Sequence, residues 1–584
     1  MRRLAATGAR YVLAGAIRRE RSTLPDAGTP SRHRRASAHL APLLLLLAAP
    51  AIAAKSATVT VLYTSDMHAN VLPVDDVRER PADGSVAQVA TLVARLRATN
   101  PRTVVLDGGD AIQGTPLGYY GIAAPASPGF DPTIAAMNLV GYDAAVLGNH
   151  EFNFGLAVLR RSLGQSRFPW LAAGLGGVAE ARLPVGDELV LERGGVRIAV
   201  LGLTNPNIPH WDPPSHWRPL EFPDPVEVAK ARVPRLRERA DVVVVVAHTG
   251  FERDLDTGEE NGTGYENFGW RLAQLPGIDV LLTGHAHRNV PPRLVGTTVV
   301  AQPGRWADTV TRIDLRVEKR GRRWNVVGWE GTNLKTAGEV ADERVLAAVG
   351  DLHARTLAEL SRPLGALAAP LPIGGVPTAD DASVDLIHAV QLEASGARLS
   401  LAAPLAAGRA ETPAGPLTPR LAHRLYPYPN TLLVVRLTGA QLKDVLEHAV
   451  RGWVGMDCAK LPCTLLRNPQ LPSYNYDTLE GASYLVDPTA PVGSRVRGLS
   501  IGNRPVAATD TLEVVINSYR AAGGGVFPHL ADAPRVREID RPMVELLVDH
   551  LANRGTITPA ATDNWAFAPP LLERVAPARS APAN

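Results

Sequence analysis

Thr283-Gly284-His285-Ala286-His287 is the stretch that decides the fold of this chain. It follows residues 278–282, a mainly apolar run that predicts a buried β-strand. Two histidines separated by one residue, directly after a strand, can both point into a cleft where a metal ion could bind. One such pair is weak evidence, because a histidine at a strand end is more often a hydrogen-bonded structural residue.

Four other strand-like runs end in the same kinds of residue. These ends are Ser65-Asp66-Met67-His68, Gly108-Gly109-Asp110, Gly148-Asn149-His150-Glu151 and Ala247-His248. Taken singly, each is better explained as turn chemistry or as a structural residue. Five such ends in one part of the chain are difficult to explain by chance, so we interpret them together.

The strand ends supply a set of candidate metal ligands: Asp66, His68, Asp110, Asn149, His248, His285 and His287. The set offers oxygen and imidazole nitrogen without thiolate, which suits Zn, Mn, Fe or Co and does not choose among them. The ligands are too many for one tetrahedral ion but fit two ions that share one carboxylate. Paired ions are typical of enzymes that transfer phosphoryl groups.

The pattern of elements predicts an α/β domain around these residues. Strand-like runs occupy residues 58–63, 103–106, 144–147, 197–203 and 242–246. Helical spacing begins at Val86, after the candidate N-cap Ser85, and recurs at residues 133–139. Later runs alternate like antiparallel strands, at residues 297–301, 310–317 and 324–329. Such an order predicts layered mixed sheets with the functional site at the strands' carboxyl ends.

The composition limits the number of domains and the classes of function to be considered. The chain has 584 residues, of which 45% are hydrophobic, so two domains with full cores are expected. The formal net charge of +3 is close to balance, which disfavours a nucleic-acid-binding protein.

The first 54 residues resemble a secretory signal. Arginine-rich sequence up to Arg35 precedes a short apolar run and then small residues. That run is too short to span a bilayer comfortably, and an uncleaved anchor is the alternative. We predict a periplasmic or secreted protein with no stable membrane span after processing. In an oxidising compartment Cys458 and Cys463, the only cysteines, could form a disulfide, although two unpaired thiols fit the spacing as well.

Beyond residue 338, apolar residues at helical spacing up to Leu360 predict a linker helix, or alternatively a last helix of the first domain. Two aromatic loops follow. They are Tyr426-Pro427-Tyr428-Pro429-Asn430, before a strand at 432–437, and Asn517-Ser518-Tyr519, which leads into a glycine run. Aromatic side chains on two loops can enclose a planar base. A proline-rich turn packed on the core and a flexible loop are the alternatives.

The ordered motifs Asp66-x-His68, Gly109-Asp110, Gly148-Asn149-His150-Glu151, His248 and Gly284-His285-x-His287 resemble those of calcineurin-like metallophosphoesterases. The two aromatic loops resemble the C-terminal domain of secreted 5′-nucleotidases and 2′,3′-cyclic-nucleotide 2′-phosphodiesterase/3′-nucleotidases. The resemblance implies an α/β protein with a four-layer α/β/β/α metallophosphoesterase domain, a linker helix and a C-terminal mixed α/β substrate-binding domain. We predict these parts at residues 55–338, 339–363 and 364–570, with a leader at 1–54 and a tail at 571–584.

The resemblance also implies roles. Asp66, His68, Asp110 and His287 would hold one divalent ion, and the shared Asp110 with Asn149, His248 and His285 the other. The ions (Zn, Mn, Co, Fe or Mg) would activate a water for attack on phosphorus. His150 would stabilise the transition state or protonate the leaving oxygen. Tyr428 and Tyr519 would stack on the base, with Asn430 a nearby polar contact.

Departures from the family pattern indicate the substrate. In 5′-nucleotidases an Asp usually orients the catalytic histidine from three residues further on, whereas here that residue is Asn153. An amide can bond the imidazole but carries no charge. Together with tyrosine where 5′-nucleotidases prefer phenylalanine, this resembles the cyclic-phosphodiesterase branch of the family. That resemblance favours 2′,3′-cyclic nucleotides and 3′-nucleotides as substrates. A 5′-nucleotidase or UDP-sugar hydrolase is the alternative, followed by a nucleotide-binding protein with an inactive metal site. We expect a monomer that binds a small nucleotide.

Overall fold

The computed structural model describes residues 55–264, 266–375, 378–406, 410–457, 464–468 and 471–568. The predicted leader, the predicted tail and both cysteines lie outside the described residues. Within those ranges, no helix is both long and apolar enough to cross a membrane.

The first sheet has seven strands in the order β15-β14-β1-β4-β5-β6-β7. Their bounds are β1 Ser56–Thr64, β4 Thr103–Asp107, β5 Ala144–Val146, β6 Trp170–Leu171, β7 Val185–Gly186, β14 Thr309–Arg320 and β15 Arg323–Lys335. Strands β1, β4, β5, β6 and β7 run parallel, and β14 pairs antiparallel with both β1 and β15. The antiparallel pairing predicted for residues 310–317 and 324–329 is therefore confirmed, and this hairpin lies at the edge of the sheet.

The second sheet has six strands in the order β12-β13-β11-β10-β9-β8. Their bounds are β8 Glu188–Arg193, β9 Val196–Leu203, β10 Val242–Ala247, β11 Val280–Thr283, β12 Asn289–Val295 and β13 Thr298–Pro303. Strands β9, β10, β11 and β13 are parallel. Antiparallel strands close both edges.

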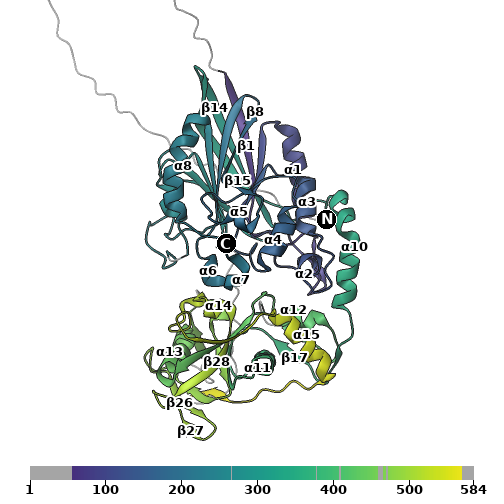
Figure 1. The fold of residues 1–584 in the computed structure, drawn as a ribbon, viewed down its shortest axis with the longest axis vertical. Helices are drawn as coiled ribbons and strands as arrows, with labels where there is room; N and C mark the ends of the chain where they lie inside the picture. The colour runs from purple at the N-terminus through teal and green to yellow at the C-terminus, as the bar shows by residue number, and fades with distance from the viewer. Residues whose placement is uncertain are drawn as a thin grey trace, which may run out of the picture. The chain divides into compact units, whose positions relative to one another are not determined.

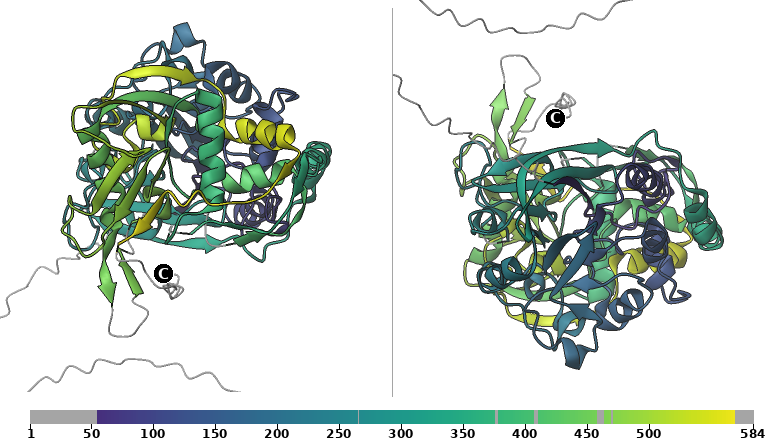
Figure 2. Two further views of the ribbon diagram at one scale, coloured as in Figure 1. Left: turned by 90° about the horizontal axis from the view of Figure 1, so that it is seen from below. Right: turned by 90° about the horizontal axis from the view of Figure 1, so that it is seen from above.

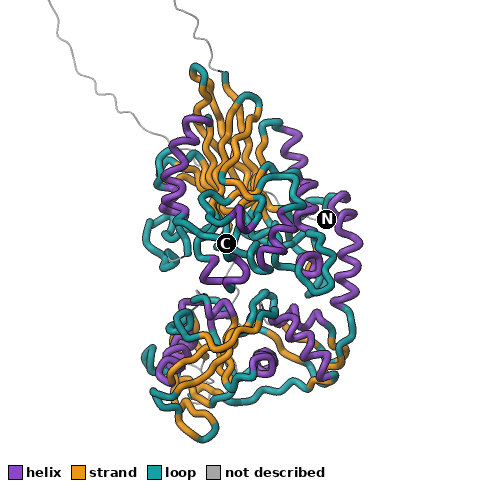
Figure 3. Tube along the Cα trace, in the orientation of Figure 1, coloured by secondary structure: helices purple, strands orange, loops and turns teal. Residues whose placement is uncertain are grey.

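Period-2 alternation along the buried strands builds four layers. One set of alternate residues, including Val61 of β1 and Val244 of β10, forms a core between the two sheets. The other set faces helices: Leu62 joins the core with α1 (Val86–Thr99) and α3 (Pro132–Val140). Val243 joins the core with α8 (Pro225–Arg239) and α9 (Gly269–Ala273). The α/β/β/α prediction is confirmed (Figures 1 and 3).

Helix α10 spans Glu343–Leu360 and begins where the Asp342 side chain accepts a hydrogen bond from the Arg344 backbone N–H. This start is four residues later than the predicted linker began. Val349 and Leu352 of α10 lie in the core that contains α1 and α3. The helix therefore packs as part of the first domain, and the domain boundaries at 338 and 363 stay predictions.

The second domain is built on a five-stranded sheet in the order β24-β18-β28-β21-β29. The bounds are β18 Leu399–Ala402, β21 Leu432–Thr438, β24 Thr478–Glu480, β28 Thr511–Asn517 and β29 Arg535–Ile539. Helix α13 (Gly439–Ala449) packs on one face. Helices α11 (Ala382–Ser395) and α15 (Met543–Arg554) pack on the other (Figure 2).

Both domains also contain shorter α-helices and β-strands. In the first domain they are β2 Val74–Asp75, β3 Arg80–Pro81, α2 Pro116–Ile122, α4 Gly155–Leu163, α5 Val178–Ala181, α6 Ile208–Trp211 and α7 Pro214–Trp217. In the second they are β16 Gly365–Leu367, β17 Leu371–Ile373, β19 Ala410–Thr412, β20 Gly415–Leu417, α12 Pro419–Leu425, β22 Trp453–Asp457, β23 Thr464–Arg467, β25 Ser483–Val486, β26 Val496–Ile501, β27 Arg504–Pro505, α14 Ser518–Ala521, β30 Thr556–Ile557 and β31 Trp565–Phe567.

Candidate metal centre

All the predicted ligands lie beyond the carboxyl ends of parallel strands, where the two sheets meet. Asp66 and His68 follow β1, Asp110 follows β4 and Asn149 follows β5. His248 follows β10, and His285 and His287 follow β11. Five of the seven side chains are buried, and only His285 and His287 are partly exposed. The site therefore draws residues from both sheets.

A first cluster joins Asp66, His68, Asp110 and His287, whose potential ligand atoms all lie within 4.8 Å of one another. The Nε2 atoms of His68 and His287 are 2.9 Å apart. Asp66 Oδ1 lies 3.5 Å from His287 Nε2. This is the set that the family resemblance assigns to one ion.

A second cluster shares Asp110 with the first. Ligand atoms of Asp110, His248 and His285 again lie within 4.8 Å of one another. His248 Nε2 is 3.1 Å from Asp110 Oδ2. Asn149 Oδ1 lies 3.1 Å from His248 Nε2 and 3.0 Å from His285 Nδ1. One carboxylate thus faces both groups of nitrogens, as two cations bridged by Asp110 would require.

Main-chain carbonyls orient two of the imidazoles. His68 Nδ1 lies 3.1 Å from the Gln113 carbonyl oxygen, and His248 Nδ1 lies 2.7 Å from that of Gly108. A carbonyl only accepts, so each Nδ1 carries a hydrogen and each Nε2 faces the cluster. Metal-binding histidines are oriented in this way by their outer nitrogen. The donor set therefore fits a divalent cation.

Burial acts against every charge in the first cluster. It raises the pKa of Asp66 to about 7. It lowers the pKa of His68 to about 4 and that of His287 to about 2. Neutral imidazole is the form that binds a metal, and a cation would stabilise the buried carboxylate. The electrostatics agree with the geometry.

In the second cluster the Asp110 carboxylate outweighs burial. Burial alone would lower the pKa of His248, but Asp110 raises it to about 10. Burial likewise opposes the charge of Asp110, yet His248 and His150 hold its pKa well below the ordinary value. Asp110 and His248 therefore form a buried ion pair in this structure, and a bound metal ion could take its place.

The backbone of the site is strained at the ligands. Five of them adopt left-handed φ values: Asp66 (54°), His68 (48°), Asp110 (56°), His285 (64°) and His287 (56°). For residues with a Cβ this conformation is uncommon and costs about 1–3 kcal/mol. Such strain is found mainly at functional sites, where surrounding structure imposes it.

Two glycines let the strand ends come together. A Cβ on Gly148 would lie 2.2 Å from Asp110 Oδ1 and 2.8 Å from His248 Cε1. Gly109 has a φ of 91°, and a Cβ there would lie 2.3 Å from the Gly148 nitrogen. Neither position can carry a side chain without displacing the cluster.

Glu151 is a site residue to which the sequence assigned no role. Its buried carboxylate accepts hydrogen bonds from the backbone N–H groups of Asp110 (2.8 Å), Ala111 (2.7 Å) and Gly148 (2.7 Å). Burial and the nearby Asp110 carboxylate raise its pKa. Glu151 therefore ties the loop after β4 to the loop after β5. Its place beside His150 was the only sequence signal.

His150 lies at the edge of the clusters. Its backbone N–H donates to Asp110 Oδ1 at 2.8 Å, and its Nε2 is 4.0 Å from Asp110 Oδ2. Its Nδ1 lies 2.6 Å from Asn153 Oδ1. The contact between imidazole and amide that the sequence suggested is present.

The predicted substrate residues lie in the second domain. Tyr428 follows α12 and is 39% exposed, whereas the neighbouring Tyr426 is buried in the core. Tyr519 lies on the short helix α14, where a loop was expected. A Cβ on Gly524 would lie 2.5 Å from the Tyr519 ring, so main chain covers that side of it. Asn430 Nδ2 points to the Tyr426 hydroxyl at 3.4 Å.

A buried ion pair, missed by the sequence analysis, supports helix α14 and the glycine run that follows it. Arg520 Nη2 lies 2.7 Å from Asp477 Oδ2, and Nη1 donates to the Gly524 carbonyl at 2.9 Å. The guanidinium also lies 4.2 Å from the centre of the Phe527 ring. Arg520 thus fixes the backbone that carries Tyr519.

Two family models match the chain: calcineurin-like phosphoesterase over residues 59–289 and 5′-nucleotidase, C-terminal domain, over residues 364–532. A 2′,3′-cyclic-nucleotide 2′-phosphodiesterase/3′-nucleotidase of Yersinia enterocolitica is 30% identical over 90% of this chain and 92% of its own length. The chain belongs to the two-domain 5′-nucleotidase family of metallophosphoesterases. It is accordingly a metal-dependent phosphoester hydrolase.

Other members of the family agree. The trifunctional nucleotide phosphoesterase YfkN of Bacillus subtilis is 30% identical over 90% of this chain, which spans only 40% of that longer protein. A structure described as a 5′-nucleotidase from Staphylococcus aureus superposes with a TM-score of 0.76 at 27% identity, covering 88% of this chain and 100% of that one. The phosphoesterase match includes every predicted metal ligand, and the C-terminal match includes Tyr428, Asn430 and Tyr519.

Proposed function

We propose that this metallophosphoesterase hydrolyses 2′,3′-cyclic nucleotides and 3′-nucleotides at a centre of two divalent cations. The observation that carries the proposal is the position of Asp110, which belongs to both ligand clusters and accepts from His150. Relatives named for these activities match about nine-tenths of the chain. A 5′-nucleotidase or UDP-sugar hydrolase is the second candidate, because a Vibrio cholerae protein named 5′-nucleotidase matches at 24% identity.

In this proposal Asp66, His68, Asp110 and His287 hold one cation, and Asp110, Asn149, His248 and His285 hold the other. When bound, such a pair supplies an activated water and offsets the charge of the phosphoryl group. His150, at the rim of the clusters, holds a proton at Nε2 for the leaving oxygen. Tyr428 and Tyr519 stack on the base, and Asn430 adds a polar contact.

The substrate and setting follow from the same proposal. The ligand is a small nucleotide, and the protein acts as an exported monomer, periplasmic or secreted. Metal identity among Zn, Mn, Co, Fe and Mg is left to the measurement, since the donor set suits several ions.

The test is phosphate and nucleoside release from 2′,3′-cyclic AMP, 3′-AMP and 5′-AMP, with Mn, Co, Zn or Mg added to metal-stripped protein. We expect turnover of the first two and poor turnover of 5′-AMP. Strong hydrolysis of 5′-AMP alone would favour the second candidate. No hydrolysis with any metal would indicate a nucleotide-binding protein.

A matched pair of variants separates the site from the rest of the molecule. His248→Gln removes a ligand from the second cluster and should lower both the bound metal, measured by mass spectrometry, and kcat. His529→Gln changes a histidine that bonds Asp444 in the second domain. It should leave metal content and kcat at wild-type values.

A further inference from the structure

The Asn153 side chain lies between His150 and a second acid, Asp212. Its Oδ1 is 2.6 Å from His150 Nδ1. Its Nδ2 donates to both carboxylate oxygens of Asp212, at 3.0 and 3.2 Å. Asp212 is only 9% exposed and follows α6, 59 positions along the chain, so no local sequence pattern links it to Asn153.

An amide can face either way, and its neighbours decide which way it faces. A carboxylate only accepts hydrogen bonds, so Asp212 holds the NH₂ group of Asn153 on its own side. The amide oxygen must then face His150, whose Nδ1 becomes the donor. The imidazole is thereby fixed in the orientation that turns Nε2 toward the metal clusters.

Asp212 is itself held in place by its own segment. Its backbone N–H donates to the Ile208 carbonyl at 3.0 Å, and its carbonyl accepts from Trp217 Nε1 at 3.1 Å. His216 Nδ1 lies 3.4 Å from Asp212 Oδ1. The first two contacts hold the main chain at Asp212, and His216 contacts the carboxylate itself.

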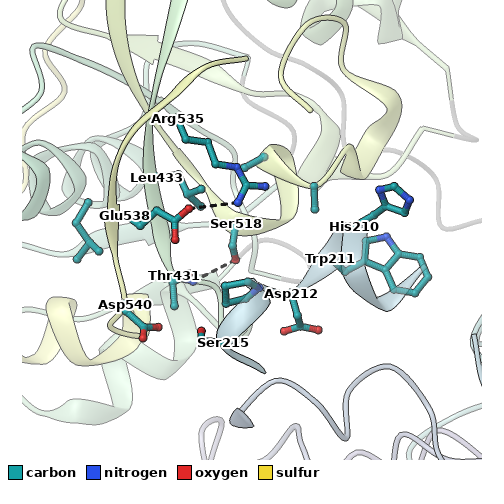
Figure 4. Close-up of a pocket in the computed structure, with 14 residues that line it drawn as sticks. His210, Trp211, Asp212, Ser215, Thr431, Leu433, Ser518, Arg535, Glu538 and Asp540 are labelled. Carbon is teal, nitrogen blue, oxygen red and sulfur yellow. Dashed lines mark hydrogen bonds and ion pairs between the residues drawn. The ribbon is translucent and has the colours of Figure 1, made fainter. Parts of the chain in front are cut away.

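The residue before Asp212 contacts the metal centre. The Trp211 ring stacks on His285, with centroids 5.2 Å apart and planes 26° apart. Figure 4 shows Trp211 and Asp212 on the same segment, with Asp212 lining a pocket that also includes Ser518. One short segment thus supports both a predicted ligand and the Asn153 amide.

We propose that Asp212 is a positioning residue that acts on the leaving group through Asn153 and His150. Position 153 carries an amide and so lacks an orienting carboxylate. Asp212 supplies that carboxylate, and the Asn153 amide lies between it and His150. This inference rests on the role proposed for His150. Asp212 orients Asn153, Asn153 orients His150, and His150 gives the Nε2 proton to the leaving oxygen as the P–O bond breaks.

The test compares leaving groups in Asp212→Ala. Phenyl phosphate needs a proton on its leaving oxygen, whereas 4-nitrophenyl phosphate leaves readily without one. We expect kcat for phenyl phosphate to fall about 100-fold, the range of general-acid contributions, with KM within about twofold. For 4-nitrophenyl phosphate kcat should fall less than about threefold. An equal loss for both substrates would show a merely structural role and overturn the proposal.

A carboxylate exchange gives a second readout. Asp212→Asn alone should lower phenyl phosphate turnover, and Asn153→Asp alone places two carboxylates in contact. The double variant, with the acid moved next to His150, should recover at least about tenfold over either single variant. A double variant no better than the singles would contradict the proposal. If Asp212→Ala does not fold, Asp212→Asn and the exchange decide alone.

The matched control is Asp540→Asn, which changes an exposed aspartate 4.0 Å from His216 Nε2. It should leave both substrates unaffected. Because the aryl phosphates carry no base, the comparison stands whichever nucleotide is preferred. Failure of the nucleotide assay would therefore reject the proposed function without deciding the role of Asp212.

Discussion

At the scale of single residues, the site depends on groups that position other groups. Glu151 binds no predicted ion, yet it receives the N–H groups of two ligand-bearing loops. Asp212 acts on His150 only through Asn153. Removing either residue should therefore affect the centre without deleting a ligand.

We expect Glu151→Gln to lower the free energy of unfolding by about 3 kcal/mol, because an amide would turn donor hydrogens toward backbone donors in a buried position. Urea unfolding measures this loss, and metal titration should show weaker binding. Glu513→Gln, which alters a surface pair with Arg436, should stay within about 0.5 kcal/mol of the wild type. Equal effects of the two changes would contradict the role given to Glu151.

His388 predicts a pH dependence for the second domain. Its Nδ1 lies 2.9 Å from Ser400 Oγ, its Nε2 lies 3.0 Å from Thr478 Oγ1, and burial lowers its pKa to about 3. Below about pH 6.5 the unfolded chain takes up a proton that the folded domain does not. Stability contributed by the neutral imidazole is therefore complete above pH 6.5 and falls by up to about 1.4 kcal/mol per pH unit toward pH 3.

His388→Gln should flatten this dependence, so that the stability difference between wild type and variant shrinks from pH 7 to pH 4 in urea titrations. Ser400→Ala keeps the imidazole and should lose stability by a similar amount at each pH. A His388→Gln variant that retains the wild-type slope would show that other groups cause it.

The seven candidate ligands could be found from the sequence because each stands directly after a run of apolar residues. Glu151, Asp212 and Arg520 could not be assigned roles in this way. Their partners are backbone groups or side chains up to 59 positions away, and only the folded chain brings them together. The local sequence pattern predicts where a strand ends. The role of a buried acid such as Glu151 or Asp212 depends instead on its tertiary contacts.

At the scale of elements, α10 shows how packing defines a helix. Its residues 345, 349 and 352 repeat at helical spacing and enter the first domain's core, while Leu346 is 37% exposed. Leu352→Ala should cost about 3 kcal/mol of unfolding free energy, because it leaves a cavity beside α2 and α3. Leu346→Ala on the same helix should cost less than about 1 kcal/mol. Chemical denaturation of both variants would test the contrast.

The buried strands followed from the sequence to within two residues, because runs such as residues 242–246 are apolar throughout and buried on both faces. The hairpin strands β14 and β15 extend three and six residues beyond their predicted ends. Helix ends were less accurate. Helix α10 starts at Glu343, after its Asp342 cap, instead of at residue 339, and α14 is a four-residue helix that hydrophobic spacing cannot reveal. Short elements depend on capping and tertiary contacts more than on periodicity.

For the whole molecule, metal binding should stabilise one domain selectively. The ligands lie in the first domain, and the second has cores of its own. We expect two calorimetric transitions, of which a chelator lowers only one. Each ion at about 100-fold its Kd contributes about 2.7 kcal/mol, which corresponds to about 5–10 °C per ion for a domain of this size. Readdition of Mn, Co or Zn should restore it, and a chelator shift in both transitions would contradict the assignment.

The division of ligands between two sheets also orders events during synthesis. Asp66, His68, Asp110 and Asn149 are made first, whereas His248, His285 and His287 follow about a hundred residues later. A growing chain that lacks the second sheet has three of the four ligands of the first cluster, but only two of the four ligands proposed for the second. We therefore expect both clusters to be complete, and to bind metal at full strength, only after the second sheet has folded.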